Sequence, residues 1–170
     1  HAVPTLCSSC LKFVFSQEEL IKTVSLAKSV GKTVVFTNGG FDLSHGGHIE
    51  FLQKAREKGD LLIVGLNSDQ SVKSIKGNDR PIKTQKERAN IISALKSVDY
   101  ITIFDKTTPE EIIRQIRPDI LVKGDDYNID EVAGREIVEG YGAKVELIPI
   151  VKGLSTTNIV TKILESHKSN

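Results

Sequence analysis

Residues 33–48, TVVFTNGGFDLSHGGH, decide the fold. The run at 33–36 is β-branched and aromatic, which predicts a short buried strand. The Asn38-Gly39-Gly40 segment ends that strand in a turn, and a helix is expected over 47–58. A strand, a glycine-rich turn and a helix in this order make one unit of an α/β fold.

The rest of the chain repeats this alternation. Four more short apolar runs predict strands at 61–66, 100–104, 120–122 and 145–150. Further helices are expected over 16–31, 84–95 and 130–141 and from 108 and 156. The strands are continuous apolar runs, so helices should cover both faces of the sheet. The sequence therefore predicts an α/β fold: a Rossmann-like, doubly wound parallel sheet of five strands with helices on both faces.

Local signals mark several helix starts. Ser16 with Glu19, and Thr84 with Glu87, have the spacing of capping boxes. Thr108 is expected to cap a helix whose first position is Pro109. The helix over 47–58 should turn an apolar face inward, made of Ile49, Leu52 and Ala55.

Composition excludes two classes of function. The 170 residues include 23 basic and 22 acidic ones, so the net charge is +1 and no broad surface for nucleic acid is expected. No apolar run approaches the length of a membrane span. We therefore expect neither a nucleic acid nor a membrane as a partner.

The N-terminal residues are excluded from the fold. The chain has no Met and begins with His1, so residues 1–12 are expected to be a disordered leader or a tag or linker remnant, and 13–170 a single domain. Cys7 and Cys10 are too few for a zinc ribbon or a disulfide framework. A reducing, cytoplasmic compartment follows as the expectation.

The first polar cluster spans 37–48. Ligands of such sheets bind beyond the carboxyl ends of the strands, which is where this cluster falls. Its glycines allow backbone amides to approach a ligand, and the helix start offers free N–H groups. His45 and His48, three residues apart, could donate to phosphate oxygens. A simple tight turn, histidine caps, or a metal pair aided by Asp42 are the alternatives.

Three further clusters follow later strands. Asn67 and Asp69 lead into a basic segment with Lys73, Lys76 and Arg80, interpreted as a mobile loop over a triphosphate or as a solvated surface loop. The KGDDY segment at 123–127 is either a site or a turn with a solvent lysine. The GLSTTN segment at 153–158 is either a helix cap or a second phosphate cradle.

Together the clusters resemble the cytidylyltransferase-like nucleotidyltransferases. GGFDLSHGGH, at 39–48, resembles their H-x-G-H signature. The set KGNDRP, VKGDDY and GLSTTN is similar, more narrowly, to the adenylyltransferase domains of ADP-heptose synthases, over about 13–164. Two positions depart from that pattern: Asp125 stands where Gly is expected, and Ser44 where Leu is usual.

The resemblance implies a role for each site residue. His45, His48 and Lys76 would be catalytic, stabilising the phosphates of ATP in the transition state. Nucleotide and phosphate binding would fall to Asn38, Gly39, Gly40, Phe41, Asp42, Arg88, Lys123, Gly124, Ser155, Thr156 and Thr157. Asn67, Asp69 and Arg80 would lie on the substrate side. No protein metal ligand is implied, and Mg²⁺ would accompany ATP.

The resemblance also implies a reaction and partners. ATP and D-glycero-β-D-manno-heptose 1-phosphate would give ADP-heptose and pyrophosphate, for the inner core of lipopolysaccharide. A homodimer is expected, either fused to or working with a sugar kinase. Three alternatives stay open: a cytidylyltransferase acting on glycerol- or ethanolamine-phosphate, a non-catalytic nucleotide-binding module, and a metal-binding protein.

Overall fold

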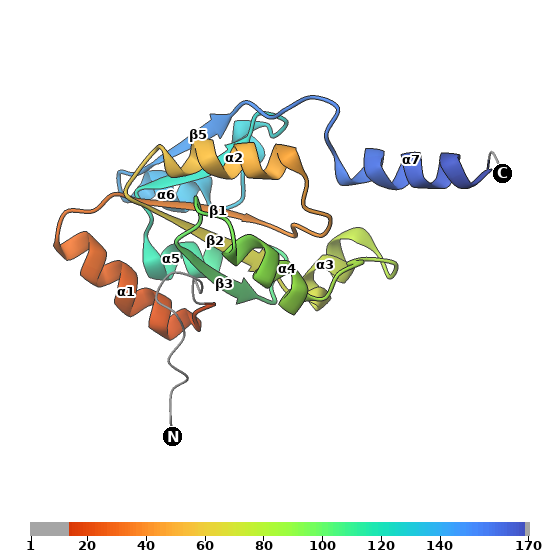
Figure 1. Ribbon diagram of the computed structural model, residues 1–170. Coiled ribbons are helices and arrows are strands. Elements are labelled where there is room, and N and C mark those ends of the chain that lie inside the picture. The colour runs from red at the N-terminus through yellow and green to blue at the C-terminus, as the bar shows by residue number, and fades with distance from the viewer. Residues whose placement is uncertain (1–13, 169–170) are drawn as a thin grey trace, which may run out of the picture.

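A computed structural model describes residues 14–168, and Figure 1 shows how the elements follow one another. The strands are β1 (Val34–Gly39), β2 (Leu61–Asn67), β3 (Tyr100–Phe104), β4 (Ile120–Gly124) and β5 (Lys144–Ile148). The helices are α1 (Gln17–Ser29), α2 (Gly46–Arg56), α3 (Asp69–Lys76), α4 (Gln85–Ser93), α5 (Glu110–Ile116), the 3₁₀ turn η1 (Ile129–Glu131), α6 (Arg135–Gly140) and α7 (Thr156–Lys168).

The sheet has five parallel strands in the order β3-β2-β1-β4-β5. Strand β1 lies at its centre, paired with β2 on one side and β4 on the other. The chain therefore reverses its winding direction between β1 and β4, and the connections after these two strands leave in opposite directions. This is the switch point at which α/β sheets bind their ligands.

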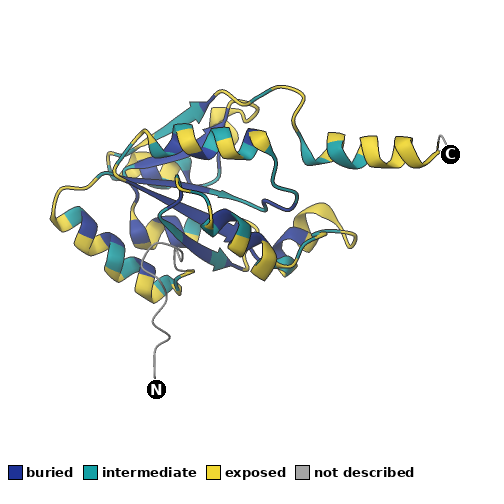
Figure 2. Ribbon diagram, viewed as in Figure 1, coloured by how far each residue is buried: buried dark blue, intermediate teal, exposed yellow. Residues whose placement is uncertain are grey.

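Helices cover both faces of the sheet, as Figure 1 shows. On one face Leu20 of α1 and Ile113 of α5 pack against Phe36, and on the other Leu52 of α2 and Ile92 of α4 pack in a second cluster. All five side chains are fully buried, each contributing roughly 1.5–3 kcal/mol. Figure 2 shows β1, β2 and β4 as largely buried beneath helices with exposed outer faces, while the edge strand β5 is mostly intermediate. The predicted fold class is confirmed.

Most local predictions hold, and two fail: the predicted cap of α5 and the orientation of Ile49. Both predicted capping boxes form, with Ser16 and Thr84 as the N-caps of α1 and α4. Pro109 itself is the N-cap of α5, without a side-chain hydrogen bond, so the predicted Thr108 cap is wrong. Ile49 is 40% exposed and not inward, because α2 begins at the carboxyl edge of the sheet and its first turn extends past the strands.

Two longer segments also differ from their predictions. The segment after β2, expected to be a loop, contains α3, whose N-cap Ser68 accepts a hydrogen bond from the Ser71 N–H. The helix predicted over 130–141 divides into η1 and α6. Gly134 separates them with φ +91°, a left-handed conformation that ends one element before the next begins.

The predicted leader at 1–12, with Cys7 and Cys10, lies outside the described residues, and the single-domain boundary stays a prediction. Within residues 14–168, no helix combines the length and the apolar content that crossing a bilayer requires.

Gly134 gives a test of this packing. We expect Gly134→Ala to destabilise the protein by more than Gly142→Ala, with a difference of at least about 1 kcal/mol. Both positions have positive φ, but a Cβ at Gly134 would sit 2.4 Å from Ile113 Cδ1, whereas nothing lies within 4 Å at Gly142. Urea unfolding of the two variants measures the difference, and equal losses would contradict the account.

Candidate active site

A cavity of about 370 Å³ opens at the carboxyl ends of β1 and β4, at the switch point. Five chain segments line it: the loop after β1, the start of α2, the end of α3, the loop after β4 and the connection from β5 into α7. The predicted site residues among its lining are Asn38, Gly39, Gly40, Phe41, Asp42, His45, His48, Lys76, Lys123, Gly124, Ser155, Thr156 and Thr157. The fold thus brings residues more than a hundred positions apart to one place.

The two histidines form the central pair of this cavity. Their ring centroids are 4.0 Å apart. His45 is the N-cap of α2 and its Nδ1 accepts the Gly47 N–H at 3.1 Å, while His48 Nδ1 accepts the His45 N–H at 3.3 Å. Because each Nδ1 accepts a hydrogen bond, each neutral ring carries its own proton on Nε2. Each histidine therefore keeps one N–H donor for a ligand.

Burial keeps this pair uncharged at neutral pH. It lowers the pKa of His48 to about 4, with further lowering by the neighbouring His45 and Lys76. Burial also lowers the pKa of His45. The histidines thus present neutral N–H donors to the cavity, which Lys76 also lines.

The loop that carries the histidines is tightly packed. Phe41 lies in a left-handed conformation with φ +48°. A Cβ added at Gly47 would lie 3.0 Å from the His45 ring and 3.3 Å from Leu154, which is tighter than ordinary contact, whereas at Gly46 the nearest atom is at 4.0 Å. Gly47 therefore allows the imidazole of His45 to fold back onto the helix start.

Asp42 holds the loop after β1 in place, and its carboxylate is already engaged by donors of the protein. Its side chain is buried and accepts hydrogen bonds at 2.9 Å from the Ile82 and Lys83 N–H groups and from Arg80 Nη1. Burial alone would raise the pKa of the Asp42 carboxyl, but these donors hold it below its ordinary value. The ionised Asp42 thus ties the loop after β1 to the segment before α4, and Arg80 is committed to it.

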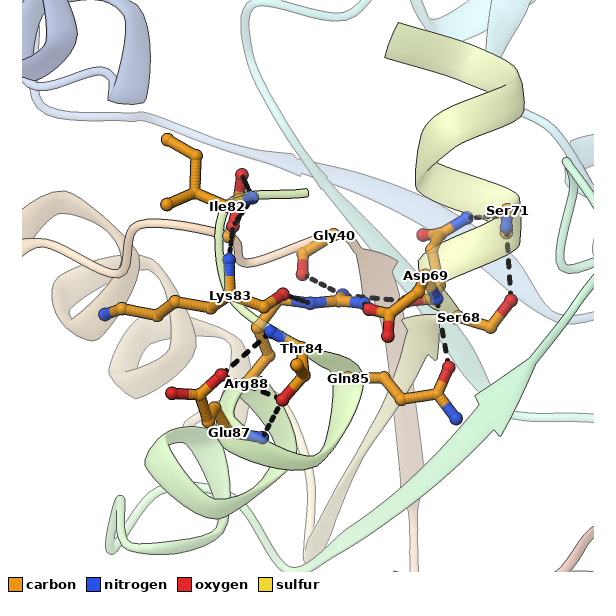
Figure 3. A network of polar contacts seen from close by, with 12 residues as sticks. Gly40, Ser68, Asp69, Ser71, Ile82, Lys83, Thr84, Gln85, Glu87 and Arg88 are labelled. Atoms are coloured by element: carbon orange, nitrogen blue, oxygen red, sulfur yellow. Dashed lines mark hydrogen bonds and ion pairs between the residues drawn. The ribbon is translucent and has the colours of Figure 1, made fainter. Parts of the chain in front are cut away.

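Arg88 does not line the cavity, and Figure 3 shows it within a network of polar contacts. This fully buried guanidinium donates to the carbonyl oxygens of Gly40 at 2.6 Å, Asn67 at 2.7 Å and Lys83 at 3.1 Å, and to Asp69 Oδ1 at 2.8 Å. These four acceptors hold Arg88, so the structure does not bring it together with the other predicted phosphate-binding residues at the cavity. It joins the ends of β1 and β2 to the start of α4.

Asn67 and Asp69, predicted on the substrate side, belong to this same network and lie outside the cavity lining. Asn67 is buried and its Nδ2 donates to Ser71 Oγ at 2.9 Å. The Asp69 N–H donates to Gln85 Oε1 at 3.0 Å (Figure 3). Together with Arg80, these residues support the cavity from outside it.

Lys123 bridges the two strands of the switch point. Its side chain is buried, and Nζ donates to the Asn38 carbonyl oxygen at 2.9 Å, linking β4 to β1. Burial lowers the pKa of Lys123 to about 8, although Asp126 nearby opposes the shift. Asp125, the departure noted in the sequence, is exposed and its Oδ1 accepts the Ile150 N–H at 3.1 Å. It does not line the cavity.

The far wall is the start of α7. Ser155 Oγ accepts the Asn158 N–H at 3.1 Å, and Thr156 Oγ1 donates to the Leu43 carbonyl oxygen at 3.5 Å. Eight lining residues were not among the predicted site residues: Thr37, Gly47, Phe51, Asp126, Tyr127, Ile150, Val151 and Leu154. Five of them lie within the polar clusters quoted from the sequence, which were the available signal, whereas Phe51, Ile150 and Val151 lie outside any motif.

A second, larger hollow of about 650 Å³ lies at the opposite edge of the sheet, and its cations are already engaged. Lys28 Nζ donates to the Arg117 carbonyl oxygen, the Arg117 guanidinium lies 4.7 Å from the Tyr141 ring, and Lys144 pairs with Glu146 at 2.7 Å. This hollow holds none of the predicted site residues.

Comparison with known proteins agrees with this geometry. The family model for cytidylyltransferase-like proteins matches residues 36–164, from within β1 to within α7. The chain belongs to the cytidylyltransferase-like family. The resemblance drawn from the sequence motifs is thereby confirmed.

Two similar proteins are both named bifunctional protein HldE. The chain is 52% identical over 152 residues to the bifunctional protein HldE of Syntrophotalea carbinolica and 54% identical over 144 residues to that of Geobacter sulfurreducens. These matches cover 89% and 85% of the chain but only 31% and 29% of the relatives, so it spans about a third of their length.

A solved structure of similar shape is the crystal structure of the lipopolysaccharide core biosynthesis protein from Thermoplasma volcanium GSS1. It has a TM-score of 0.60 and 27% sequence identity, covering 72% of this chain and 98% of that one.

The role assigned to Arg88 predicts a loss of stability. We expect Arg88→Lys to destabilise this cytidylyltransferase-like domain by about 3 kcal/mol, because an ammonium cannot reach four acceptors in different directions. Arg114→Lys is the matched control, since Arg114 is exposed and pairs only with Glu110 at 3.6 Å, and should change stability by less than about 0.5 kcal/mol. Similar losses in urea unfolding would show that the buried network is dispensable.

The His48 pKa predicts a pH-dependent stability. The unfolded state, with a pKa of about 6.5, binds the proton before the folded state does, so folding weakens as the pH falls from about 6.5 to 4. His48→Asn keeps an acceptor for the His45 N–H and removes the titration. We expect the wild type to lose about 2 kcal/mol more than this variant between pH 7 and pH 5. Parallel pH profiles in urea unfolding would refute it.

Proposed function

We propose that this chain is an adenylyltransferase domain. It transfers the adenylyl group of ATP to D-glycero-β-D-manno-heptose 1-phosphate and releases pyrophosphate. The other product, ADP-heptose, is a precursor of lipopolysaccharide. The observation that carries the proposal is the pair of neutral histidines at the start of α2, facing the same cavity as Lys76 and the hydroxyls of 155–157. The similarity to HldE proteins and to a lipopolysaccharide core biosynthesis protein supports the choice of substrate.

The chemistry requires no nucleophile from the protein. An oxygen of the sugar phosphate attacks the α-phosphorus of ATP, the new P–O bond forms, and the bond to the β-phosphate oxygen breaks to release pyrophosphate. Negative charge grows on the α-phosphoryl oxygens and on the leaving group. The Nε2–H groups of His45 and His48 donate to these oxygens, and Lys76 neutralises them. Fixed donors aimed at growing charge are a strong source of catalysis.

Two helix starts add a favourable field for the phosphates. The first residues of α2 and of α7 line the cavity, and the positive ends of their dipoles favour anions, although the Gly47 and Asn158 N–H groups are already engaged by His45 Nδ1 and Ser155 Oγ. Mg²⁺ enters as part of the MgATP substrate. Among residues 14–168 no group of three or more His, Cys, Asp or Glu side chains is placed to hold a metal ion, and Asp42 is saturated by its own donors.

A companion enzyme fits this proposal. The chain spans about a third of relatives named bifunctional, so we propose that a sugar kinase, fused or separate, supplies the acceptor phosphate. Its product would be the substrate bound here beside ATP.

Pyrophosphate release tests the proposal. The protein is supplied with ATP or CTP and with heptose 1-phosphate, glycerol phosphate or ethanolamine phosphate. We expect turnover with ATP and the heptose, reduced at least about 10²-fold in His48→Ala. Preference for CTP with glycerol or ethanolamine phosphate would instead show a cytidylyltransferase. Nucleotide binding without turnover of any pair would show a non-catalytic binding module.

Lys76 separates binding from catalysis. We expect Lys76→Ala to lower kcat by about 10²–10³ while the Kd for ATP changes much less, because the contact strengthens as charge grows in the transition state. Lys73→Ala is the control, since Lys73 lies on the same helix, is exposed and does not line the cavity. Equal losses in ATP affinity and in kcat/KM would mean that Lys76 binds ground and transition states alike.

A further inference from the structure

The end of α3, which carries Lys76, has little packing of its own. Lys76 is the last residue of this helix, and every residue from 73 to 79 is exposed (Figure 2). The first turn of α3 holds to the body of the protein, because Ser71 and Val72 are buried and Ser71 Oγ donates to the Lys106 carbonyl oxygen at 2.7 Å. An isolated helix of eight residues is unstable in water, so its outer turn requires a second attachment.

The ion pair between Arg80 and Asp42 provides that attachment. Arg80 Nη1 lies 2.9 Å from Asp42 Oδ2, and the two side chains are 21% and 1% exposed. The Arg80 N–H donates to the Gly77 carbonyl oxygen at 3.2 Å, and the Gly77 N–H donates to the Lys73 carbonyl oxygen at 2.9 Å. These two backbone hydrogen bonds connect Arg80 to the last turn of α3. A guanidinium held at Asp42 therefore also holds the end of the helix.

Asp42 belongs at the same time to the loop that carries the histidines. It stands three positions before His45, and its neighbour Phe41 has a left-handed backbone conformation with φ +48°. One buried carboxylate thus anchors the histidine loop and, through Arg80, the segment that follows Lys76. Burial and His45 lower the pKa of His48 most, and Lys76 lowers it further, as expected for an ammonium group nearby.

We propose that Arg80 is a positioning residue, which sets the place of Lys76 relative to the two histidines. The inference rests on the proposed function, in which Lys76 neutralises the charge that grows on the phosphates. Arg80 acts through Lys76, by holding the turn after α3 against Asp42. A catalytic group displaced by about 1 Å can lose a large part of its effect, so such an anchor matters for the rate.

The geometry favours this role over the direct substrate contact that the sequence predicted for Arg80. The residue does not line the cavity. To reach a substrate, its guanidinium would have to leave Asp42, and a buried carboxylate that loses its cationic partner costs free energy. The two backbone donors at 82 and 83 would remain on Asp42, so a variant of Arg80 should still fold.

A double-mutant cycle tests whether Arg80 acts through Lys76. We expect Arg80→Gln to lower kcat for pyrophosphate release at least about 10-fold while the Kd for ATP stays within about twofold. The double variant Arg80→Gln/Lys76→Ala should be no slower than Lys76→Ala, because no ammonium is left to position. Arg80→Lys keeps a cationic donor for Asp42 and should recover most of the loss.

Arg56→Gln is the matched control. Arg56 Nε pairs with Asp99 Oδ2 at 2.8 Å, and Asp99 also accepts the Leu62 N–H at 2.8 Å, at the opposite edge of the sheet. The variant therefore removes a similar arginine–aspartate pair far from the cavity, and kcat should not change. Circular dichroism melts show whether both glutamine variants stay folded.

Trypsin cleavage without nucleotide tests the anchor independently of the reaction. We expect cleavage after Lys76, identified by fragment mass, to be at least about 10-fold faster in Arg80→Gln than in the wild type or in Arg56→Gln, because the released segment opens more often. Equal cleavage rates, losses that multiply in the double variant, or a rise in the Kd for ATP that matches the fall in kcat would each overturn the proposal. Faster cleavage of a protein that releases no pyrophosphate would uphold the anchoring of Lys76 while removing the proposed reaction.

Discussion

The buried guanidinium of Arg88 is the interaction on which the cavity depends. It holds carbonyl oxygens at the ends of two neighbouring strands and at the start of α4. Those carbonyls belong to loops that end in glycine or polar residues and have little apolar surface of their own to bury. A single rigid, planar cation with several donors replaces the packing that such loops lack. Arg88 thereby fixes the backbone of the glycine-rich loop at Gly40, and this loop leads to the two histidines.

Asp42 and Lys123 extend the same principle to the sides of the cavity. Each ionisable group is buried and satisfied by backbone atoms, Asp42 by N–H groups of 82 and 83 and Lys123 by the carbonyl of Asn38. Buried charges of this kind cost free energy unless they are fully partnered. Here they serve to set backbone positions, while the histidines and Lys76 line the cavity without such a backbone-bridging role.

Features set by residues close together in the sequence could be predicted, whereas contacts between distant residues could not. Capping boxes at Ser16 and Thr84 involve residues three apart, and the apolar runs of the strands are local, so both were predicted correctly. The α3 helix was missed because it is polar and buries little beyond Ser71 and Val72. The partners of Arg88 include Gly40, 48 positions away, and no local pattern records such a contact. Most lining residues lie within a motif, although Asp126, Tyr127 and Leu154 were missed inside theirs, and the supporting network emerged only from the fold.

The spacing between the histidines has a consequence for how the family signature varies. Only the second intervening glycine faces the folded-back imidazole, while a Cβ at the first would meet Leu154 at an ordinary contact distance of 4.0 Å. A side chain at the second position would press on the imidazole, whereas one at the first would not. The second glycine of the H-x-G-H pattern therefore makes room for the imidazole that folds back onto the helix start, whereas the position marked x has no imidazole beside it.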